Sequence, residues 1–402
     1  MRLPVFTPNS PTASAPAPLA AALAALLVFS PIQQTFSPLH VPAAHARELA
    51  SGSGSKVNKD PLSLMRFGLP GQPKEVRELQ ANMEEAQDQI SRLLYGQSKA
   101  AIDKARGNIK GKSEKMLAAV PAADKEAGKA LLASMDANMA KFGEQLVATN
   151  SAGATEAGVA ALDDLSKFEG LIAAATKPLP VPSEFDNLPQ LNKRATVEFV
   201  IKKDGDAQFD IDGNLFKEAR MKMSIDGYTA PVTAGNFVDL VQRGYYNGMH
   251  IQRSDGFVVQ MGDPSKEQGG NEKINGFVPA GAEKVRTIPL EVLVKGDKAP
   301  IYGSTFDDDG RGGYAAELPF NAYGALGMAR EEYNADSASS QFFWLLFDSD
   351  LTPAGKNLLD GRYSCFGYTI EGARFLSDIK EGDVIVSAKV VEGAENLKPP
   401  KA

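Results

Sequence analysis

The chain has 402 residues, of which 43% are hydrophobic and 23% charged, and its formal net charge is -7. This length and composition are typical of a soluble protein with two domains, and the acidic balance excludes nucleic acid as the main partner, because phosphate binding needs a basic face. The single cysteine, Cys365, and only three histidines exclude an intramolecular disulfide, a His/Cys metal site and Ser-His or Cys-His catalysis. We therefore expect no metal and no other cofactor.

Residues 1–46 are predicted to be a targeting segment that is removed by cleavage. They contain no acidic residue, an uncharged apolar run at 19–29 and, at Ala44-His45-Ala46, a small-x-small cleavage pattern. The apolar run is too short to span a bilayer. This combination is typical of a signal for the chloroplast thylakoid lumen, with a signal for the bacterial periplasm as the alternative. Both place the mature chain, which would start near Arg47, outside the cytosol.

Residues 47–175 are predicted to form an antiparallel helical bundle. Apolar residues recur there at steps of three and four, which places them on one face of a helix, and breaks at Gly96 and Pro121 help to divide the pattern into four segments. The predicted core residues are Val76, Leu79, Met83, Ala86, Ile90, Leu93, Ile102, Ala105, Ile109, Met116, Val120, Leu131, Met135, Met139, Phe142, Leu146, Val159, Leu162, Leu165, Phe168 and Ile172. Residues 176–194 are rich in proline and predict a stiff, extended hinge.

The period changes to two in residues 195–395, which predicts β-strands. Apolar and polar residues alternate in "TVEFVI" and "ARMKMSI", and later apolar runs include "GFVVQM", "SQFFWLLF" and "DVIVSAKV". One helix is predicted in "VTAGNFVDLVQRG", with Thr233 as its N-cap and Gly244 as its stop. Many short strands with few helices predict a closed barrel. The fold class is therefore multidomain α + β, a helical bundle followed by a β-barrel.

Four motifs in residues 195–395 resemble those of the cyclophilin family and occur in the same order: "APVTAGNFVDL", "DGFVVQMGDP", "SSQFFWLL" and "LLDGRYSCFGYTIEG". The resemblance implies a closed antiparallel eight-stranded β-barrel with two capping helices and a peptidyl-prolyl cis-trans isomerase groove. Together with the leader and a helical domain that starts near "DPLSLMRFGLP", the chain resembles the large multidomain thylakoid-lumen cyclophilins of plants and algae.

The resemblance to the lumenal subgroup also implies partners. They are proline-containing client proteins, among them subunits of photosystem II, and a thylakoid phosphatase. The implied role is folding and assembly of photosystem II. No transmembrane segment is expected in the mature chain, and its contact with the thylakoid membrane would be peripheral.

The resemblance implies a role for eight residues. Arg253 matches the catalytic arginine of the family. The positions that match substrate-binding residues are Phe257, Val258, Gln260, Ala329, Gln341, Phe343 and Leu359. Rotation about an X–Pro bond crosses a barrier of roughly 18–20 kcal/mol, and it needs neither a nucleophile nor a metal. A donor aimed at the prolyl nitrogen favours the twisted transition state, and the permanent charge of an arginine suits that task.

The predicted groove departs from the family pattern at several positions. The turn Ser254-Asp255-Gly256 is one residue shorter than usual, and Asp255 is expected to pair with Arg253 or with Arg330. The other departures are Val258 for Met, Arg330 and Glu331 for an Asn-Ala pair, Leu358 for Trp and Tyr363 for His. These departures predict slow isomerisation, because a small misplacement of a catalytic group costs about 100-fold in rate.

Two functions therefore stay open at the level of the sequence. One is an isomerase that depends on Arg253. The other is an inactive peptide-binding chaperone or phosphatase-regulating module, which uses the same groove and the long insertion at 265–320. In both, we expect the helical domain to pack on the barrel and to limit access to the groove.

Overall fold

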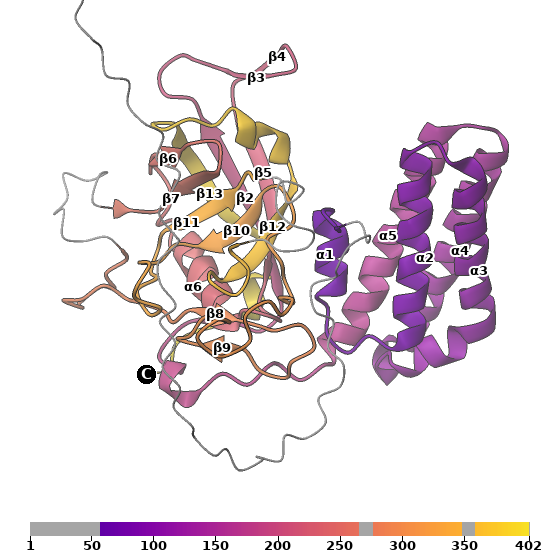
Figure 1. Ribbon diagram of the computed structural model, residues 1–402, viewed down its shortest axis with the longest axis horizontal. Helices are drawn as coiled ribbons and strands as arrows, with labels where there is room; N and C mark the ends of the chain where they lie inside the picture. Colours follow the sequence, from indigo (N-terminus) through magenta and orange to yellow (C-terminus); the bar gives the residue numbers. More distant parts are fainter. Residues whose placement is uncertain (1–56, 265–275, 348–357, 402) are drawn as a thin grey trace, which may run out of the picture. The chain divides into compact units, whose positions relative to one another are not determined.

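The computed structural model describes residues 57–264, 276–347 and 358–401 (Figure 1). Arg47–Ala402 form one compact unit. The predicted leader at 1–46 and the first part of the insertion, 265–275, lie outside the described residues. Within the described ranges, no helix is both long and apolar enough to cross a bilayer.

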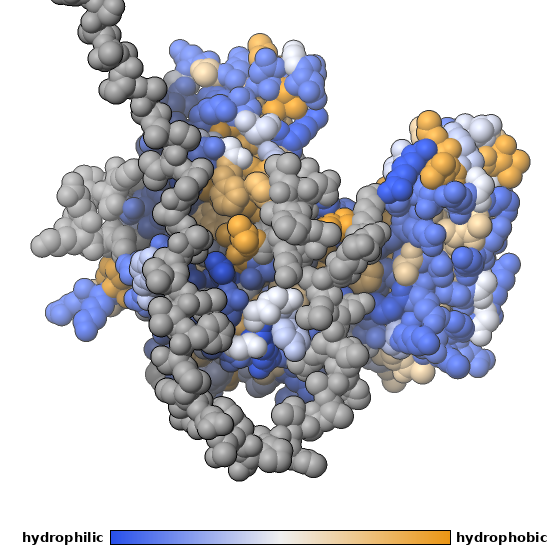
Figure 2. All heavy atoms as spheres, in the orientation of Figure 1, coloured by the Kyte–Doolittle hydropathy of each residue, from blue (hydrophilic) through white to orange (hydrophobic). Residues whose placement is uncertain are grey.

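Four long helices form the predicted bundle (Figure 1). They are α2 (Lys74–Ser91), α3 (Tyr95–Ala118), α4 (Lys125–Val147) and α5 (Ser151–Ala174). Their apolar faces form one buried cluster that includes Val76, Met116, Met139 and Phe168, so the helical periodicity is confirmed. The bundle surface seen in Figure 2 is mostly hydrophilic, as expected when the apolar stripes face inward.

Three details of the predicted bundle are wrong. Val159 is exposed, and the small residues Ala157 and Ala161 are buried on α5 instead. Leu132 rather than Leu131 enters the core of α4. The first break falls at Leu93, which has a left-handed φ of 59° and is itself exposed, whereas Gly96 lies inside α3. Periodicity alone does not distinguish neighbouring apolar residues at the edge of a stripe.

A short helix, α1 (Pro61–Phe67), precedes the bundle and is held at its C-terminal end by two arginines. Arg77 of α2 donates to the carbonyls of Arg66, Phe67 and Leu69 at 2.6–2.9 Å. Arg194 donates to the carbonyl of Met65 at 2.6 Å. Helix C-termini leave carbonyls without intrahelical partners, and these cations satisfy them from both domains.

The second half of the chain forms a curled, antiparallel eight-stranded sheet in the order β13-β2-β5-β12-β10-β11-β7-β6 (Figure 1). Its strands are β2 (Arg194–Lys202), β5 (Ala219–Asp226), β6 (Arg253–Ser254), β7 (Val258–Met261), β10 (Ala325–Met328), β11 (Phe342–Leu345), β12 (Cys365–Glu371) and β13 (Val384–Glu392). The predicted closed barrel is not observed. The end strands β13 and β6 do not pair, and an isolated bridge between His250 and Val384 approaches closure.

Short pairs of strands lie outside this sheet. They are β1 (Gln190–Leu191) with β14 (Leu397–Lys398), β3 (Phe209–Ile211) with β4 (Asn214–Phe216), and β8 (Glu291–Val292) with β9 (Ile301–Tyr302). The resemblance implied two capping helices. Among the described residues after 194 there is one α-helix, α6 (Pro231–Gln242), and a five-residue 3-10 helix at Ala373–Ser377 stands in place of a second.

The curled sheet has two faces with different partners. Phe342 and Trp344 of β11 point inward and pack with Phe237 of α6 in the main core. The alternate residues Phe343 and Leu345 belong to a separate cluster on the other face, which we call the outer cluster. Its buried members are Leu64, Met65, Val258, Leu318, Phe320, Ala322, Ala325, Phe343, Leu345, Cys365 and Tyr368. This alternation is the period-two rule for strands, and α1 contributes to the outer cluster through its first two members.

The insertion is packed in its described part. Leu290, Val292, Val294 and Phe306 form a small core of their own. Glu291 of β8 reaches the start of α6, where its carboxylate accepts from the backbone N–H groups of Val232 and Thr233 at 3.2 and 2.8 Å. The prediction that Thr233 caps this helix is therefore wrong, because a carboxylate 58 residues away along the chain takes that place.

Candidate functional site

The predicted catalytic and binding residues meet on the outer face of the sheet. Arg253 of β6 lies opposite Gln260 of β7, Gln260 lies opposite Phe343 of β11, and Phe343 lies opposite Gly327 of β10. Directly opposite residues in antiparallel strands project from the same face. The register therefore builds one row, Arg253–Gln260–Phe343–Gly327, which we call the cross-strand row.

Arg253 does not extend freely from this row, because it is bound to its own turn. Its Nε donates to Oδ2 of Asp255 at 2.6 Å, and its Nη2 forms an ion pair with the same oxygen. Oδ1 of Asp255 accepts from the N–H groups of Phe257 and Val258, each at 3.0 Å. Of the two pairings expected for Asp255, the one with Arg253 is formed.

The same contacts fix the charge of Asp255. Burial raises the pKa of the Asp255 carboxyl, but the hydrogen bonds from Val258 N–H, from Arg253 and from Phe257 N–H together outweigh burial, and the pKa lies below its ordinary value of 3.8. The carboxylate is therefore charged throughout the range of pH 5–8.

The two glutamines of the site bind each other. Nε2 of Gln260 donates to Oε1 of Gln341 at 3.0 Å, and the backbone N–H of Ala329 donates to the carbonyl of Gln341 at 3.0 Å. A polar pocket of about 180 Å³ adjoins this pair. Its lining residues are Gln260, Ala329, Arg330, Glu331, Ser337, Ser339 and Gln341. The predicted clamp residues are thus brought together beside a space large enough for a side chain.

Phe343, the predicted floor of the proline pocket, is covered. Only 5% of its surface is exposed. The ring of Phe320 stacks on it at 6.0 Å with an interplanar angle of 16°, and Tyr363 meets it edge-on at 5.8 Å. Phe343 is thus packed against two aromatic rings, and exposing it to a proline would require Phe320 or Tyr363 to move.

Gly327 lets the Phe343 ring lie directly on strand β10. A Cβ at Gly327 would stand 2.1 Å from Cζ of Phe343, which no packing tolerates. We expect Gly327→Ala to cost about 1–3 kcal/mol of stability, the usual range for overpacking, and to expose Phe343. Urea unfolding measures the cost.

Gly143→Ala on α4 is the matched control for Gly327→Ala, because nothing lies within 4 Å of the Cβ it would add. Alanine also has the higher helix propensity there, so the control should be neutral or stabilising. Equal effects of the two variants would contradict the close packing of Phe343 on Gly327.

Arg330 fastens the loops on either side of Tyr363. It donates from Nε and Nη2 to the carbonyl of Arg362 at 3.0 and 2.8 Å, and its guanidinium lies 5.0 Å from the centre of the Tyr363 ring. Arg362 in turn donates twice to Asp307 of the insertion. The Arg330 side chain is therefore fixed by these contacts and helps to hold Tyr363 against Phe343.

Only some of the remaining predicted binding residues lie in or against the outer cluster. Val258 is buried in the outer cluster, and Leu359 packs against that cluster. Phe257 is 40% exposed, and its ring contacts Phe347 at 5.4 Å. Leu358, at the position where the family has Trp, is exposed. One wall of the predicted pocket is thus open to solvent while its floor is covered.

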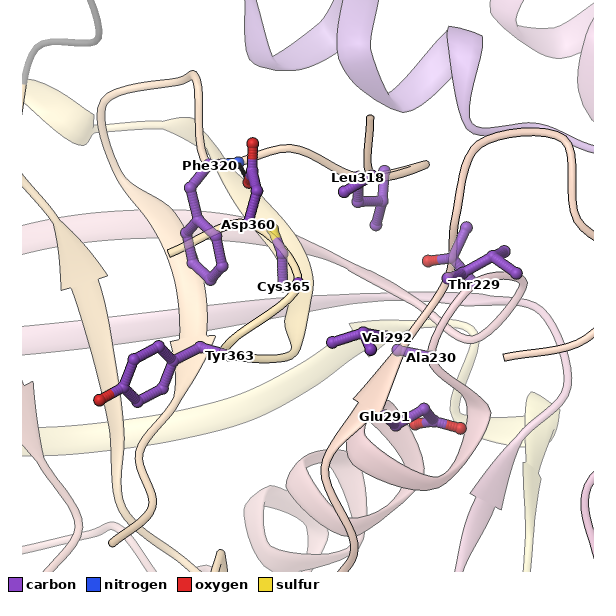
Figure 3. Close-up of a pocket in the computed structure, with 12 residues that line it drawn as sticks. Thr229, Ala230, Glu291, Val292, Leu318, Phe320, Asp360, Tyr363 and Cys365 are labelled. Carbon is purple, nitrogen blue, oxygen red and sulfur yellow. Dashed lines mark hydrogen bonds between the residues drawn. The ribbon is translucent and has the colours of Figure 1, made fainter. Parts of the chain in front are cut away.

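A second cavity lies between the start of α6 and the loop before β12 (Figure 3), and its lining includes Phe320 and Tyr363, which pack on Phe343. Its volume of about 20 Å³ admits one water molecule. Asp360 lies beside it and accepts from the N–H of Phe320 at 2.7 Å, and burial raises the pKa of its carboxyl to about 7. Cys365 also lines it as a buried, free thiol, and burial raises the pKa of that thiol.

Sequence reasoning missed Phe320, Gly327, Asp307 and Arg362. Phe320 stands in "ELPFNAYG", which has no periodic pattern, and its contact with Phe343 joins the insertion side of the chain to β11. Asp307 and Arg362 are 55 residues apart. Only the shortened turn carried a usable signal, because Asp255 lies two residues from Arg253.

Comparisons with known proteins agree with this arrangement. Residues 208–396 match the family "Cyclophilin type peptidyl-prolyl cis-trans isomerase/CLD", and residues 60–172 match "Peptidyl-prolyl cis-trans isomerase CYP38-like, PsbQ-like domain". The chain is 40% identical to peptidyl-prolyl cis-trans isomerase CYP38, chloroplastic, of Arabidopsis thaliana, over 85% of this chain and 76% of that protein.

Two further relatives match a similar share of this chain. A putative thylakoid lumen peptidyl-prolyl cis-trans isomerase of Synechocystis is 40% identical over 84% of each chain. The chloroplastic isomerase CYP37 of Arabidopsis thaliana is 31% identical over 86% of this chain and 72% of that protein. Because two family models match its two domains and these relatives match 84–86% of its length, the chain belongs to the cyclophilin-type peptidyl-prolyl cis-trans isomerase family, as a member with a CYP38-like helical domain.

Proposed function

We propose that the chain is a lumenal cyclophilin that binds proline-containing segments of client proteins and isomerises them slowly. The observation that carries the proposal is the cross-strand row, which presents a guanidinium, an amide and an aromatic floor on one face of the sheet. Arg253 would donate to the prolyl nitrogen as the amide twists, and Gln260 would hold the client backbone. The proline would have to bind against Phe343 after Phe320 or Tyr363 moves.

Two observations support a low rate. Arg253 is engaged by Asp255, so its donors must change partner before they serve a substrate. Phe343 is almost fully covered, so proline binding also carries the cost of rearranging an aromatic pair. A cost that must be met before the transition state subtracts directly from catalysis.

The same two observations favour a second candidate, a peptide-binding module without turnover. In that function, the polar pocket beside Gln260 and Gln341 would bind client backbone, and the covered floor would leave the proline outside. In either function, the described part of the insertion would hold the loop at Arg362 in place through the pairing of Asp307 with Arg362.

The names of the relatives support a location in the thylakoid lumen, because one is called chloroplastic and another a putative thylakoid lumen protein. We place the chain there as part of the proposal. Subunits of photosystem II and a thylakoid phosphatase are the partners that this location would supply. The groove-limiting role predicted for the helical domain stays a prediction, and α1 supports it by packing Leu64 and Met65 into the outer cluster.

Arg253→Ala should lower the isomerisation rate of a proline peptide by roughly tenfold or more, because it removes the one charged donor of the row. The measurement is cis–trans exchange by NMR with the chain from Arg47 onward. Arg220→Ala is the control, since Arg220 is also an exposed arginine in an ion pair but lies on β5. Binding that survives with no exchange, in the unsubstituted chain and in both variants, would establish the second candidate.

A further inference from the structure

We infer that Asp255 is a positioning residue that withholds Arg253 from a bound proline peptide and thereby sets the isomerisation rate. The inference rests on the proposed function, and it adds a specific reason for slow turnover that lies inside the shortened turn. It predicts that one conservative substitution makes this protein a faster isomerase.

The contacts of Arg253 define the restraint. Nε and Nη2 form one edge of the guanidinium, and both are directed at Oδ2 of Asp255. That edge is the rigid donor fork that makes arginine suitable for binding two acceptors at once. While it is bound to Asp255, the edge is not available to the carbonyl and the prolyl nitrogen of a client.

The two oxygens of Asp255 have separate tasks. Oδ1 accepts from the N–H groups of Phe257 and Val258 and so shapes the turn, in which Gly256 has a φ of 82°. Oδ2 holds Arg253. Asp255→Asn retains Oδ1 for the turn and places an NH₂ group at the position of Oδ2, where it cannot accept from a guanidinium. The substitution thus removes the restraint and keeps the turn.

The size of the effect follows from exposure. The side chains of Arg253 and Asp255 are 53% and 39% exposed, so this is a surface ion pair. Such pairs are weak, and releasing Arg253 should raise the rate by about two- to fivefold. Because the arginine contacts the prolyl nitrogen mainly in the transition state, kcat should rise while KM stays unchanged.

Salt and pH provide independent readouts. Salt screens exposed pairs, so raising the ionic strength should increase kcat of the unsubstituted chain and narrow its difference from Asp255→Asn. The turn also has other charged neighbours, because the hydroxyl of Ser254 donates to the carbonyl of Ile379. The segment around Ile379 carries Asp378, Lys380 and Glu381. The difference between the two proteins should nevertheless stay constant from pH 5 to pH 8, because Asp255 is charged throughout that range.

The test compares four proteins and one control, each as the chain from Arg47 onward. They are the unsubstituted chain, Asp255→Asn, Arg253→Ala and the double variant. Glu218→Gln is the matched control, because it breaks another exposed pair, with Arg220, far from the row. Each is measured for kcat and KM on a proline peptide by NMR exchange, and the solvent exchange of the Arg253 Nε–H is recorded from its side-chain resonance.

The expected result is faster solvent exchange at Arg253 Nε–H and a raised kcat in Asp255→Asn, with the gain abolished in the double variant and absent in Glu218→Gln. A fall in kcat would show that Asp255 orients Arg253 for catalysis, and it would overturn the inference. Unchanged exchange at Nε–H would also overturn it. If Arg253→Ala leaves the rate unchanged, the proposed function fails instead. If Asp255→Asn then also leaves kcat unchanged, the inference fails together with the proposed function.

Discussion

Replacing Glu291 with alanine should lower the free energy of unfolding by about 3–5 kcal/mol, because it leaves three hydrogen-bond donors without their acceptor. Glu291 is 1% exposed, and its carboxylate accepts from Val232 N–H, from Thr233 N–H and from the hydroxyl of Tyr302, the last at 2.8 Å. Alanine would leave these donors without their acceptor, beside the small cavity that Glu291 lines, and each unsatisfied buried group costs about 1–3 kcal/mol.

Urea unfolding of Glu291→Ala and Glu291→Gln measures this effect. Glutamine keeps one acceptor oxygen but directs an NH₂ group at donors. Glu291→Gln should therefore lose part of the free energy of unfolding that Glu291→Ala loses. Glu317→Ala is the control, because Glu317 is also on the insertion side and accepts one backbone bond, from Gly296 N–H. Losses below about 1 kcal/mol for Glu291→Ala would show that α6 does not depend on the insertion.

Acidification should stabilise the helical domain, through Glu169 on α5. Burial raises the pKa of Glu169 to about 8 despite the nearby Arg77 and Arg66, and within the described residues its carboxylate oxygens have no hydrogen-bond partner. The closest cation atom, Nη1 of Arg77, lies 3.6 Å from Oε1. Glu169 is therefore a carboxyl that is neutral in the folded chain at pH 5 and charged when the chain unfolds.

The sign of the pH dependence follows from these two pKa values. The folded value of about 8 lies above the ordinary value of 4.5, so the stability that Glu169 contributes is complete below pH 4.5 and is lost as the pH rises through 8. Between pH 5 and pH 8 the unsubstituted chain should lose on the order of 3 kcal/mol relative to Glu169→Gln, which has no charge to bury.

Urea unfolding at several pH values tests the role of Glu169. Asp136→Asn is the control, because the hydrogen bond from Arg106 lowers the pKa of Asp136 against the effect of burial, and this carboxyl is charged in both states between pH 5 and pH 8. Its curve should run parallel to that of the unsubstituted chain. If Glu169→Gln also runs parallel, the buried carboxyl does not control the pH response.

Most of the architecture could be predicted from the sequence. Stripes such as Val76, Leu79 and Met83 follow helical geometry alone, and they are buried as predicted. The roles of Phe342 and Phe343 could not be read from periodicity, since "QFFWLLF" is apolar without interruption after its glutamine. The family motif implied that Phe343 lies in the groove, and the strand register places it opposite Gln260.

What escaped prediction depends on contacts between distant parts of the chain. The cap of α6 is supplied by Glu291 rather than by Thr233, and the floor of the groove is covered by Phe320, which belongs to no motif. The sheet stops short of a closed barrel, and backbone hydrogen bonds between residues 248–251, ahead of the two-residue strand β6, and residues 382–385 link its two ends. By contrast, the pairing of Arg253 with Asp255 was foreseen, because the two residues are neighbours in one turn.

The central claim is that clients bind on the cross-strand row and that Arg253 acts on them there. Titration of a proline peptide into the chain from Arg47 onward, followed by amide NMR, tests it most directly. Shifts should concentrate in β6, β7, β10 and β11 and at Tyr363, and cis–trans exchange peaks of the peptide should disappear in Arg253→Ala. Shifts confined to the helices α2–α5, or exchange that is unaffected by Arg253→Ala, would contradict the account.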